Sequence, residues 1–373
     1  MVQKNLMDWF VPFKDLTPAQ RAVIGKTTAR ATGRHWIKGY AGSGKTIVLT
    51  HAAIVLLKKN RRAKVCYLTY THALKDLTAM GLAQAGADAV EVRTVNDFFH
   101  SPAKYSHILV DEVQDIAAAK LKVIVASAPH VIAAGDPAQS LYPNSPNPKQ
   151  ISGTLKSPQV HILRDMPRLS LTTYQIGHHI NPSAKAANGA EVREEGSRAV
   201  VLKASSQNAE FNKVFQLAEA AAKPGAPAAV LFPKHTQIQD FADCVAKLKG
   251  AGAVPPRKAM HQGNYEDFNE FFTKAKVPLR YFGNSSGDLA ESEKRKTVFV
   301  MTYHSAKGLD FPHVFIPGLT SEAQLDARPK PLSKLSNERT LLFVAITRTK
   351  NQLTLSYHGE PHTLITDLPE ECI

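Results

Sequence analysis

The chain has 373 residues, of which 43% are hydrophobic and 21% charged, a composition typical of a soluble globular protein with room for two domains. An excess of 46 Lys and Arg over 32 Asp and Glu gives a formal net charge of +14, which favours a polyanionic partner such as nucleic acid. Three widely spaced cysteines exclude a disulfide framework, and no stretch approaches the roughly 18 apolar residues of a membrane span, so we expect a cytoplasmic protein without membrane contacts.

Strand-like and helix-like segments alternate along the chain, which predicts an α/β fold with parallel sheets flanked by helices. The first half has candidate helices and strands, in chain order, at 18–28 (helix), 47–59 (helix), 64–69 (strand), 107–110 (strand), 117–126 (helix) and 130–134 (strand). Residues 142–158 are rich in Pro, Ser and Asn and are predicted to form a loop.

The second half begins again at 170–174 and repeats the alternation. Its candidate elements are 208–222 (helix), 228–232 (strand), 237–249 (helix), 297–301 (strand), 313–316 (strand), 338–348 (helix) and 352–356 (strand). We therefore expect two domains, residues 1–165 and 166–373, with a ligand cleft between them.

A phosphate-binding loop is predicted where a short apolar segment meets a helix-like run, at Gly39-Tyr40-Ala41-Gly42-Ser43-Gly44-Lys45-Thr46. Its glycines allow successive backbone N–H groups to point at phosphate oxygens, and the following helix presents its positive end to them. Lys45 reaches the β- and γ-phosphates, and the Thr46 hydroxyl is a ligand for Mg²⁺. The loop predicts binding of a nucleoside triphosphate.

Two further segments follow apolar strands and carry side chains suited to nucleotide hydrolysis. Asp111 and Glu112 end the strand at 107–110, where the first carboxylate can hold Mg²⁺ and the second can deprotonate a water molecule. The alternative to these chemical roles is that the acidic pair only caps the start of a helix. Gln139 follows the strand at 130–134, where it could sense a γ-phosphate.

The order and the amino-acid residues of these segments resemble the motifs of the UvrD/Rep-like helicases of superfamily 1 (the SF1A group). The resemblance spans nearly the whole chain. The matching segments are 16–20, 39–46, 68–72, 93–98, 111–115, 135–142, 301–311 and 342–350. The resemblance implies two RecA-like domains in tandem, with ATP and Mg²⁺ as cofactors.

The resemblance also implies roles for individual residues. Catalytic roles fall to Lys45, Glu112, Gln139 and Arg348, with Arg348 as an arginine finger from the second domain, and metal binding falls to Thr46 and Asp111. The nucleotide would be held by Gln20, Gly39, Gly42, Ser43, Gly44, Lys45, Thr46, Tyr174, Gly308 and Asp310. Nucleic acid would be contacted by Thr69, Tyr70, His72, Thr94, Tyr142, Thr302 and His304. An ordinary half-buried strand tyrosine is the alternative for Tyr70, and a structural hydrogen bond between domains is the alternative for His304.

The sequence departs from the family pattern at several positions. Gln175 stands after Tyr174 where the family has an arginine, and Ile47 stands where an arginine often packs on adenine. The aromatic residue that normally follows the segment 135–142 is missing, so Tyr142 is the candidate to replace it. Asp310 replaces a glutamate. The gap before Asp111 has no room for the family's first helical insertion, so we expect a minimal form without the accessory domains.

These observations predict an ATP-dependent translocase or helicase that moves 3′ to 5′ on a single strand, with DNA the expected track and a monomer the expected form. One alternative is an ATP-gated DNA-binding subunit that serves a partner such as a nuclease and unwinds little by itself. Another is a nucleotide-dependent binding module with negligible turnover. A small-molecule kinase would leave the segments 301–311 and 342–350 unexplained.

Overall fold

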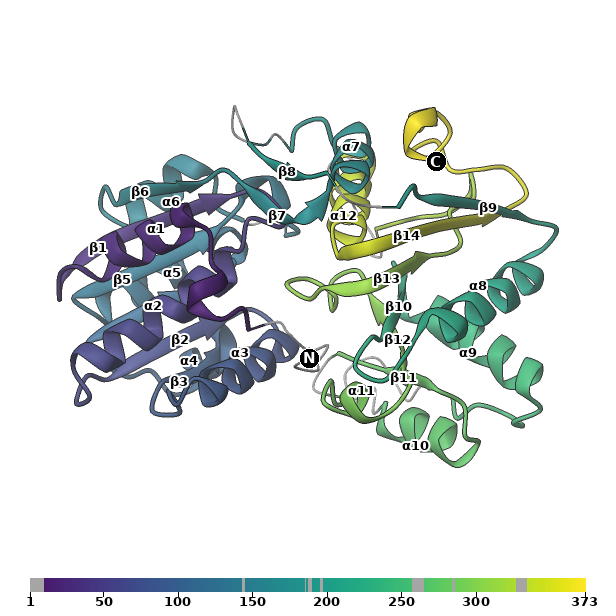
Figure 1. Ribbon diagram of the computed structural model, residues 1–373, viewed down its shortest axis with the longest axis horizontal. Coiled ribbons are helices and arrows are strands. Elements are labelled where there is room, and N and C mark those ends of the chain that lie inside the picture. The colour runs from purple at the N-terminus through teal and green to yellow at the C-terminus, as the bar shows by residue number, and fades with distance from the viewer. Residues whose placement is uncertain are drawn as a thin grey trace. The chain divides into compact units, whose positions relative to one another are not determined.

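The computed structural model describes residues 10–142, 145–184, 186, 190–194, 197–256, 265–283, 286–326 and 334–373. These residues form two compact units (Figure 1). The N-terminal unit contains residues 10–168 and 183–192, and the C-terminal unit contains residues 169–182 and 193–373. The chain passes between the units within a separate two-stranded sheet of β7 (Met166–Ser170) and β8 (Val192–Arg193).

The N-terminal unit is built on one parallel sheet with the strand order β3-β2-β4-β5-β1-β6. The strands are β1 (Gly33–Gly39), β2 (Val65–Thr69), β3 (Glu91–Thr94), β4 (His107–Val110), β5 (His130–Gly135) and β6 (Gln159–Leu163). The central strands are buried on both faces, which explains their continuous apolar sequences, such as Ile108-Leu109-Val110. Because all strands are parallel, their carboxyl ends meet at one edge, where open α/β sheets bind ligands.

Helices cover both faces of this sheet and complete a three-layer unit. They are α1 (Pro18–Thr28), α2 (Lys45–Lys59), α3 (His72–Gln84), α4 (Val95–His100), α5 (Ala118–Ala126) and α6 (Pro148–Thr154). Tyr67 of β2 lies in the core shared with α1 and α2, whereas its neighbours Cys66 and Leu68 lie in the core shared with α4, α5 and α6. The period of two along the strand therefore divides the apolar residues between two cores.

The C-terminal unit repeats this plan with a second parallel sheet in the order β11-β12-β10-β13-β14-β9. Its strands are β9 (Val200–Ala204), β10 (Ala228–Phe232), β11 (Leu279–Tyr281), β12 (Val298–Thr302), β13 (Phe311–Ile316) and β14 (Thr349–His358). Its helices are α7 (Leu171–Ile180), α8 (Gln207–Ala221), α9 (His235–Lys249), α10 (Glu266–Lys274), α11 (Glu291–Lys294) and α12 (Lys334–Ile346). Helices α8, α9 and α10 share one core with the sheet, and α7 packs against α12.

The predicted α/β fold with helix-flanked parallel sheets is confirmed. Helix α1 has the predicted bounds because Thr17 caps it, with Gln20 completing a reciprocal capping box and Pro18 in the first turn. The predicted loop at 142–158 is wrong in part, because it contains α6, which Asn147 caps in the same reciprocal manner with Gln150. An Asn-Pro pair with Gln three residues after the Asn is the capping signal that the Pro and Ser content concealed.

In the described part of the chain, no helix is both long enough and apolar enough to cross a membrane.

Candidate active site

The phosphate-binding loop leaves the carboxyl end of β1 and enters α2 at Lys45, as the sequence predicts. Gly42 and Gly44 have φ angles of 80° and 81°, in the left-handed region that favours glycine. A Cβ on Gly44 would lie 2.5 Å from Nε2 of Gln20, so the loop also has no space for a side chain there. Lys45 Nζ donates hydrogen bonds to the Gly39 and Tyr40 carbonyls at 2.8 and 3.1 Å, which folds the lysine over its own loop.

Gln20 joins helix α1 to this loop. Its Nε2 donates to the Ser43 carbonyl at 3.0 Å, and its Oε1 accepts a hydrogen bond from the Thr17 backbone N–H at 3.0 Å. Both ends of the amide are thus engaged within the N-terminal unit, in a side chain that is only 5% exposed. The structure shows Gln20 supporting the phosphate loop.

Asp111 is fully buried at the carboxyl end of β4, close to Thr46 at the start of α2. Thr46 donates a hydrogen bond to the Asp111 carboxyl, and the Tyr67 hydroxyl donates to Asp111 Oδ2 at 3.3 Å. Burial and the nearby Glu112 charge together raise the pKa of Asp111 to about 6, although the hydrogen bonds from Thr46 and the Glu112 backbone and the charge of Lys45 act in the opposite direction. A carboxylate whose charge is disfavoured by burial, beside a hydroxyl, is a donor set that suits a hard cation such as Mg²⁺.

Glu112 follows directly and has a φ angle of 52°, an uncommon value for a residue with a side chain. Its backbone N–H donates to Asp111 Oδ1 at 2.9 Å, and its carboxylate Oε2 accepts a hydrogen bond from Nε2 of Gln114 at 2.6 Å. The side chain is only 6% exposed. Asp111 and Glu112 therefore have different side-chain partners although they are neighbours in sequence.

Gln139 lies in the short 3₁₀ helix at Pro137–Gln139, which follows β5. Its Nε2 donates to Asp136 Oδ2 at 2.8 Å, and its side chain is 2% exposed. Strand β5 lies between β4 and β1 in the sheet. The phosphate loop, Asp111 and Gln139 therefore leave three neighbouring strands at the same edge.

The expected nucleic-acid residues of the N-terminal unit follow β2, β3 and β5 at this edge. The rings of Tyr70 and Tyr142 lie 4.9 Å apart at an interplanar angle of 34°, so the two expected aromatic residues form one pair. Thr69 and Thr94 are buried, and their hydroxyls serve the local backbone: Thr69 donates to the Thr71 carbonyl, and Thr94 caps α4. His72 is exposed at the start of α3.

The remaining expected residues belong to the C-terminal unit. Arg348 is 4% exposed and donates to the Val344 and Leu309 carbonyls at 2.9 and 3.3 Å, and to the Thr347 hydroxyl at 3.0 Å. Thr302, at the end of β12, accepts a hydrogen bond from the Ser305 backbone N–H. The neighbouring expected residues are His304 and Asp310, both half-buried, and Gly308, which has a φ angle of 81°.

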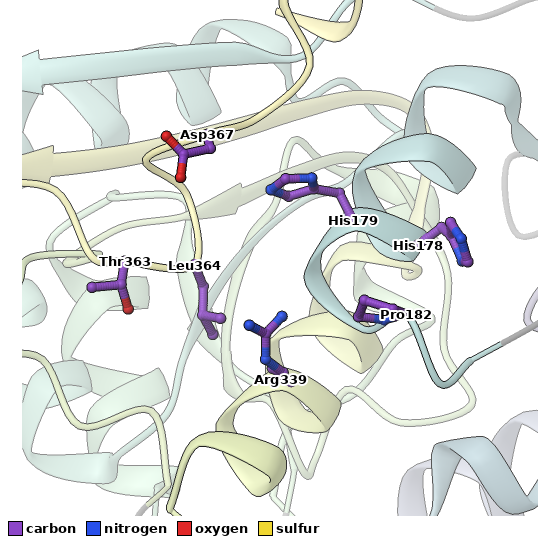
Figure 2. A pocket seen from close by; sticks show the side chains of 7 residues that line it. All are labelled: His178, His179, Pro182, Arg339, Thr363, Leu364 and Asp367. Carbon is purple, nitrogen blue, oxygen red and sulfur yellow. The ribbon is translucent and has the colours of Figure 1, made fainter.

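Tyr174, on α7, stacks on His178 with ring centroids 6.1 Å apart. Its neighbour Gln175 accepts a hydrogen bond from the Cys372 thiol at 3.3 Å, so this side chain is tied to the end of the chain. A pocket of about 420 Å³ lies beyond the end of α7, and Figure 2 shows His179 and Arg339 among the residues that line it. None of the residues expected to bind nucleotide or nucleic acid lines this pocket.

Three residues of the site were missed by the sequence interpretation. Tyr67 gives no signal in an apolar strand, and Asp136 is an ordinary residue of a Gly-Asp-Pro turn. Gln114 could have been found from the sequence, because it lies within the acidic cluster, two residues after Glu112. The contacts that these residues make depend on which strands lie side by side.

Two family models match the chain. Residues 20–144 match the model described as an AAA domain, and residues 256–360 match the model of the UvrD-like helicase C-terminal domain. The first match contains the phosphate loop, Asp111, Glu112 and Gln139. The second contains Thr302, His304, Gly308, Asp310 and Arg348.

Curated relatives match over shorter stretches. DNA helicase II of Salmonella typhimurium is 33% identical over 131 residues, which are 31% of this chain and 18% of that protein. The Escherichia coli DNA helicase II is 32% identical with the same coverage, and the ATP-dependent DNA helicase Rep of Buchnera aphidicola is 33% identical over 21% of this chain and 14% of its own length. The matched stretches thus span less than a fifth of these relatives.

Among solved structures, the match to the PRRSV helicase covers 94% of this chain and 57% of that chain, with 14% identity and a TM-score of 0.46. The helicase nonstructural protein 10 of an arterivirus covers 89% of this chain and 61% of its own, with 16% identity and a TM-score of 0.43.

Proposed function

Because the chain belongs to the UvrD-like helicase family, we propose that it is an ATP-dependent translocase or helicase on single-stranded DNA. In this proposal it hydrolyses ATP to ADP and phosphate with Mg²⁺ and moves 3′ to 5′, as the family resemblance implies. The curated relatives are named as DNA helicases, which supports DNA as the track. The observation that carries the proposal is the gathering of the phosphate loop, Thr46, Asp111 and Glu112 at one edge of the N-terminal sheet.

The residues of this edge suit the separate tasks of hydrolysis. The loop N–H groups and Lys45 would bind the phosphates, which requires Lys45 to leave the Gly39 and Tyr40 carbonyls. Thr46 and Asp111 would hold Mg²⁺, which offsets charge on the β- and γ-phosphates when bound. Glu112 would orient a water molecule and accept its proton, and Gln139 would contact the γ-phosphate.

We further propose that Arg348 supplies the positive charge that stabilises the transition state. Its guanidinium is held by two carbonyls and one hydroxyl of its own unit, so its orientation is set before any ligand binds. Such an arginine contributes about 10³–10⁵ to the rate in other nucleotide hydrolases. On the nucleic-acid side, the Tyr70 and Tyr142 pair would stack on bases, at about 1–3 kcal/mol per base.

The first test measures ATP hydrolysis with Mg²⁺ in the presence of single-stranded DNA, single-stranded RNA, duplex DNA or no nucleic acid. We expect strong stimulation by single-stranded DNA. The ATP turnover rate of the Glu112→Gln variant should be about 10²–10⁴-fold lower, because glutamine keeps the shape of the side chain but cannot act as the base. Glu219→Gln, the same chemical change on the surface of the C-terminal unit, should match the parent.

Turnover in Glu112→Gln equal to that of the parent would contradict the assignment of the base. Stimulation by RNA and not by DNA would contradict the track. A strand-displacement assay separates the helicase from the alternative role: ATP turnover without unwinding would favour a subunit that acts through a partner such as a nuclease. Sedimentation of the chain on single-stranded DNA would test the proposed monomer.

A further inference from the structure

Gln114 is a fully buried side chain that joins the proposed base, Glu112, to the loop after the next strand of the sheet. Its Nε2 donates to Glu112 Oε2 at 2.6 Å, and its Oε1 accepts a hydrogen bond from the backbone N–H of Asp136 at 3.1 Å. Glu112 follows β4 and Asp136 follows β5, and these strands are neighbours. One amide therefore bridges the two loops at the carboxyl edge.

The partners of Gln114 fix which end of its amide faces which loop. A backbone N–H can only donate, so it must face the amide oxygen, and the NH₂ group must then face Glu112. The Glu112 carboxylate oxygen accepts this hydrogen bond, so the amide fixes the position of the carboxylate. Rotation of the amide by 180° would leave both bonds unmade.

Gly135 provides the space for this amide. A Cβ at this position would lie 2.2 Å from Oε1 of Gln114 and 2.9 Å from Cγ1 of Val113. The backbone of Gly135 is that of an ordinary strand, so the need for glycine here is steric and not conformational. The space for the Gln114 side chain thus depends both on Gly135 in β5 and on the segment after β4 that carries Gln114.

The connection continues from Asp136 to Gln139. Asp136 Oδ2 accepts a hydrogen bond from Gln139 Nε2 at 2.8 Å, and its Oδ1 accepts one from the Ala138 N–H at 3.0 Å. A second link joins the same two loops, because the Leu141 N–H donates to Asp115 Oδ1 at 3.2 Å. A movement of Gln139 therefore moves Asp136, and with it the partner of the Gln114 amide.

We propose that Gln114 is a positioning residue for ATP hydrolysis, which holds Glu112 ready to accept a proton and links it to Gln139. This inference rests on the proposed function, in which Glu112 is the base and Gln139 contacts the γ-phosphate. When Gln139 leaves Asp136 for the γ-phosphate, the Asp136 loop is released, and Gln114 transmits that change to Glu112. The position of the Glu112 carboxylate then changes only when a triphosphate is present.

The test compares Gln114→Met, which keeps the volume and removes the amide, with the parent. We expect kcat to fall about 10- to 100-fold, the loss typical of a misplaced catalytic group, while KM for ATP stays within about twofold. Gly135→Ala should give the same signature by displacing the amide.

Thr28→Val is the matched control, because it deletes another buried hydrogen bond of the N-terminal unit, from the Thr28 hydroxyl to the Ile24 carbonyl at 2.8 Å. It should lower the melting temperature without changing kcat. The fold loss of kcat in the Gln114→Met, Gln139→Ala double variant should be smaller than the product of the losses in the two single variants. Multiplicative effects would overturn the link between the two residues.

A parental kcat in Gln114→Met would overturn the inference. If Glu112→Gln is inactive in the same experiment, the proposed function stands and only the role of Gln114 fails. If Glu112→Gln keeps parental turnover, the proposed function fails, and the role of Gln114 fails with it.

Discussion

Asp111 is the residue at which the requirements of the fold and of the proposed chemistry conflict most. It is fully buried, and its charge is opposed by that burial and by Glu112, so its pKa rises to about 6. Since the usual pKa of 3.8 applies in the unfolded chain, the folded state binds more protons between these two values. The Asp111 charge therefore destabilises the ligand-free fold above pH 6, and less so as the pH falls.

Asp111→Asn should consequently stabilise the ligand-free protein at pH 7.5, because it removes a buried charge that the fold disfavours. The same change should abolish Mg²⁺-dependent ATP hydrolysis. Thermal denaturation of both proteins without nucleotide at pH 7.5 and pH 4.5 would test this. The difference should shrink at the lower pH, and a less stable variant at pH 7.5 would contradict the expectation.

Gln175 illustrates how one substitution fits its surroundings. The family pattern has an arginine here, whereas the Gln175 Oε1 accepts a hydrogen bond from the buried Cys372 thiol. The Cys372 carbonyl in turn accepts from the Ala199 N–H at 2.7 Å, just before β9. The neutral Gln175 side chain thus links Cys372 to α7. An arginine could not replace it in this contact, because a guanidinium has no hydrogen-bond acceptor.

At the scale of elements, four histidines form a row across neighbouring strands β4, β5, β1 and β6. Nδ1 of His107 and Nδ1 of His130 are 2.9 Å apart, and Nδ1 of His35 lies 3.1 Å from Nε2 of His161. The His35 and His130 rings, 5.4 Å apart, join the two pairs. In each bonded pair one nitrogen donates and the other accepts, which requires at least one neutral imidazole.

Burial lowers the pKa of all four histidines, to about 4 for His35 and for His130. The charge of His161 adds to the effect at His35, the charges of His107 and His35 at His130, and that of Lys26 at His161. The charge of Arg34 also lowers the pKa of His130, whereas a hydrogen bond with the Thr27 backbone raises it. Because the unfolded chain binds protons near pH 6.5, the stability is fully present above that value and is lost as the pH falls towards 4.

We therefore expect the free energy of unfolding to fall steeply between pH 6.5 and pH 4. Each histidine that charges only on unfolding contributes about 1.36 kcal/mol per pH unit. Urea denaturation at a series of pH values would measure the slope. His130→Phe should flatten it, whereas His100→Gln, on the surface of the same unit, should not. An unchanged slope in His130→Phe would exclude the row as the cause.

At the scale of the whole molecule, the formal charge of +14 is consistent with the proposed polyanionic track. Each DNA phosphate neutralised by the protein should add about −0.7 to the slope of log K against log salt for a single strand. Fluorescence anisotropy with labelled single-stranded DNA at several salt concentrations would measure this slope. Affinity that does not change with salt would contradict a groove that follows the backbone.

Much of the fold and site was predictable because it depends on local pattern. The phosphate loop, the apolar strand before Asp111 and the cap at Thr17 each use residues close together in sequence, so their spacing identifies them. Helix α6 also has a local capping signal, but the Pro and Ser content of residues 142–158 predicts a loop instead. Helix α3 was missed where no strong apolar period marks it.

The sequence by itself determined the α/β class, the order of the motifs and the chemical types of the residues at the candidate site. Only the tertiary structure decided that Gln114 joins Glu112 to Asp136, that Tyr70 pairs with Tyr142, and that four histidines align across the sheet. Apart from the bond between Gln114 and Glu112, these contacts join residues that are distant in the chain and that the strand order β2-β4-β5-β1-β6 brings together. Strand order is set by the packing of whole elements, and spacing along a sequence carries no record of it.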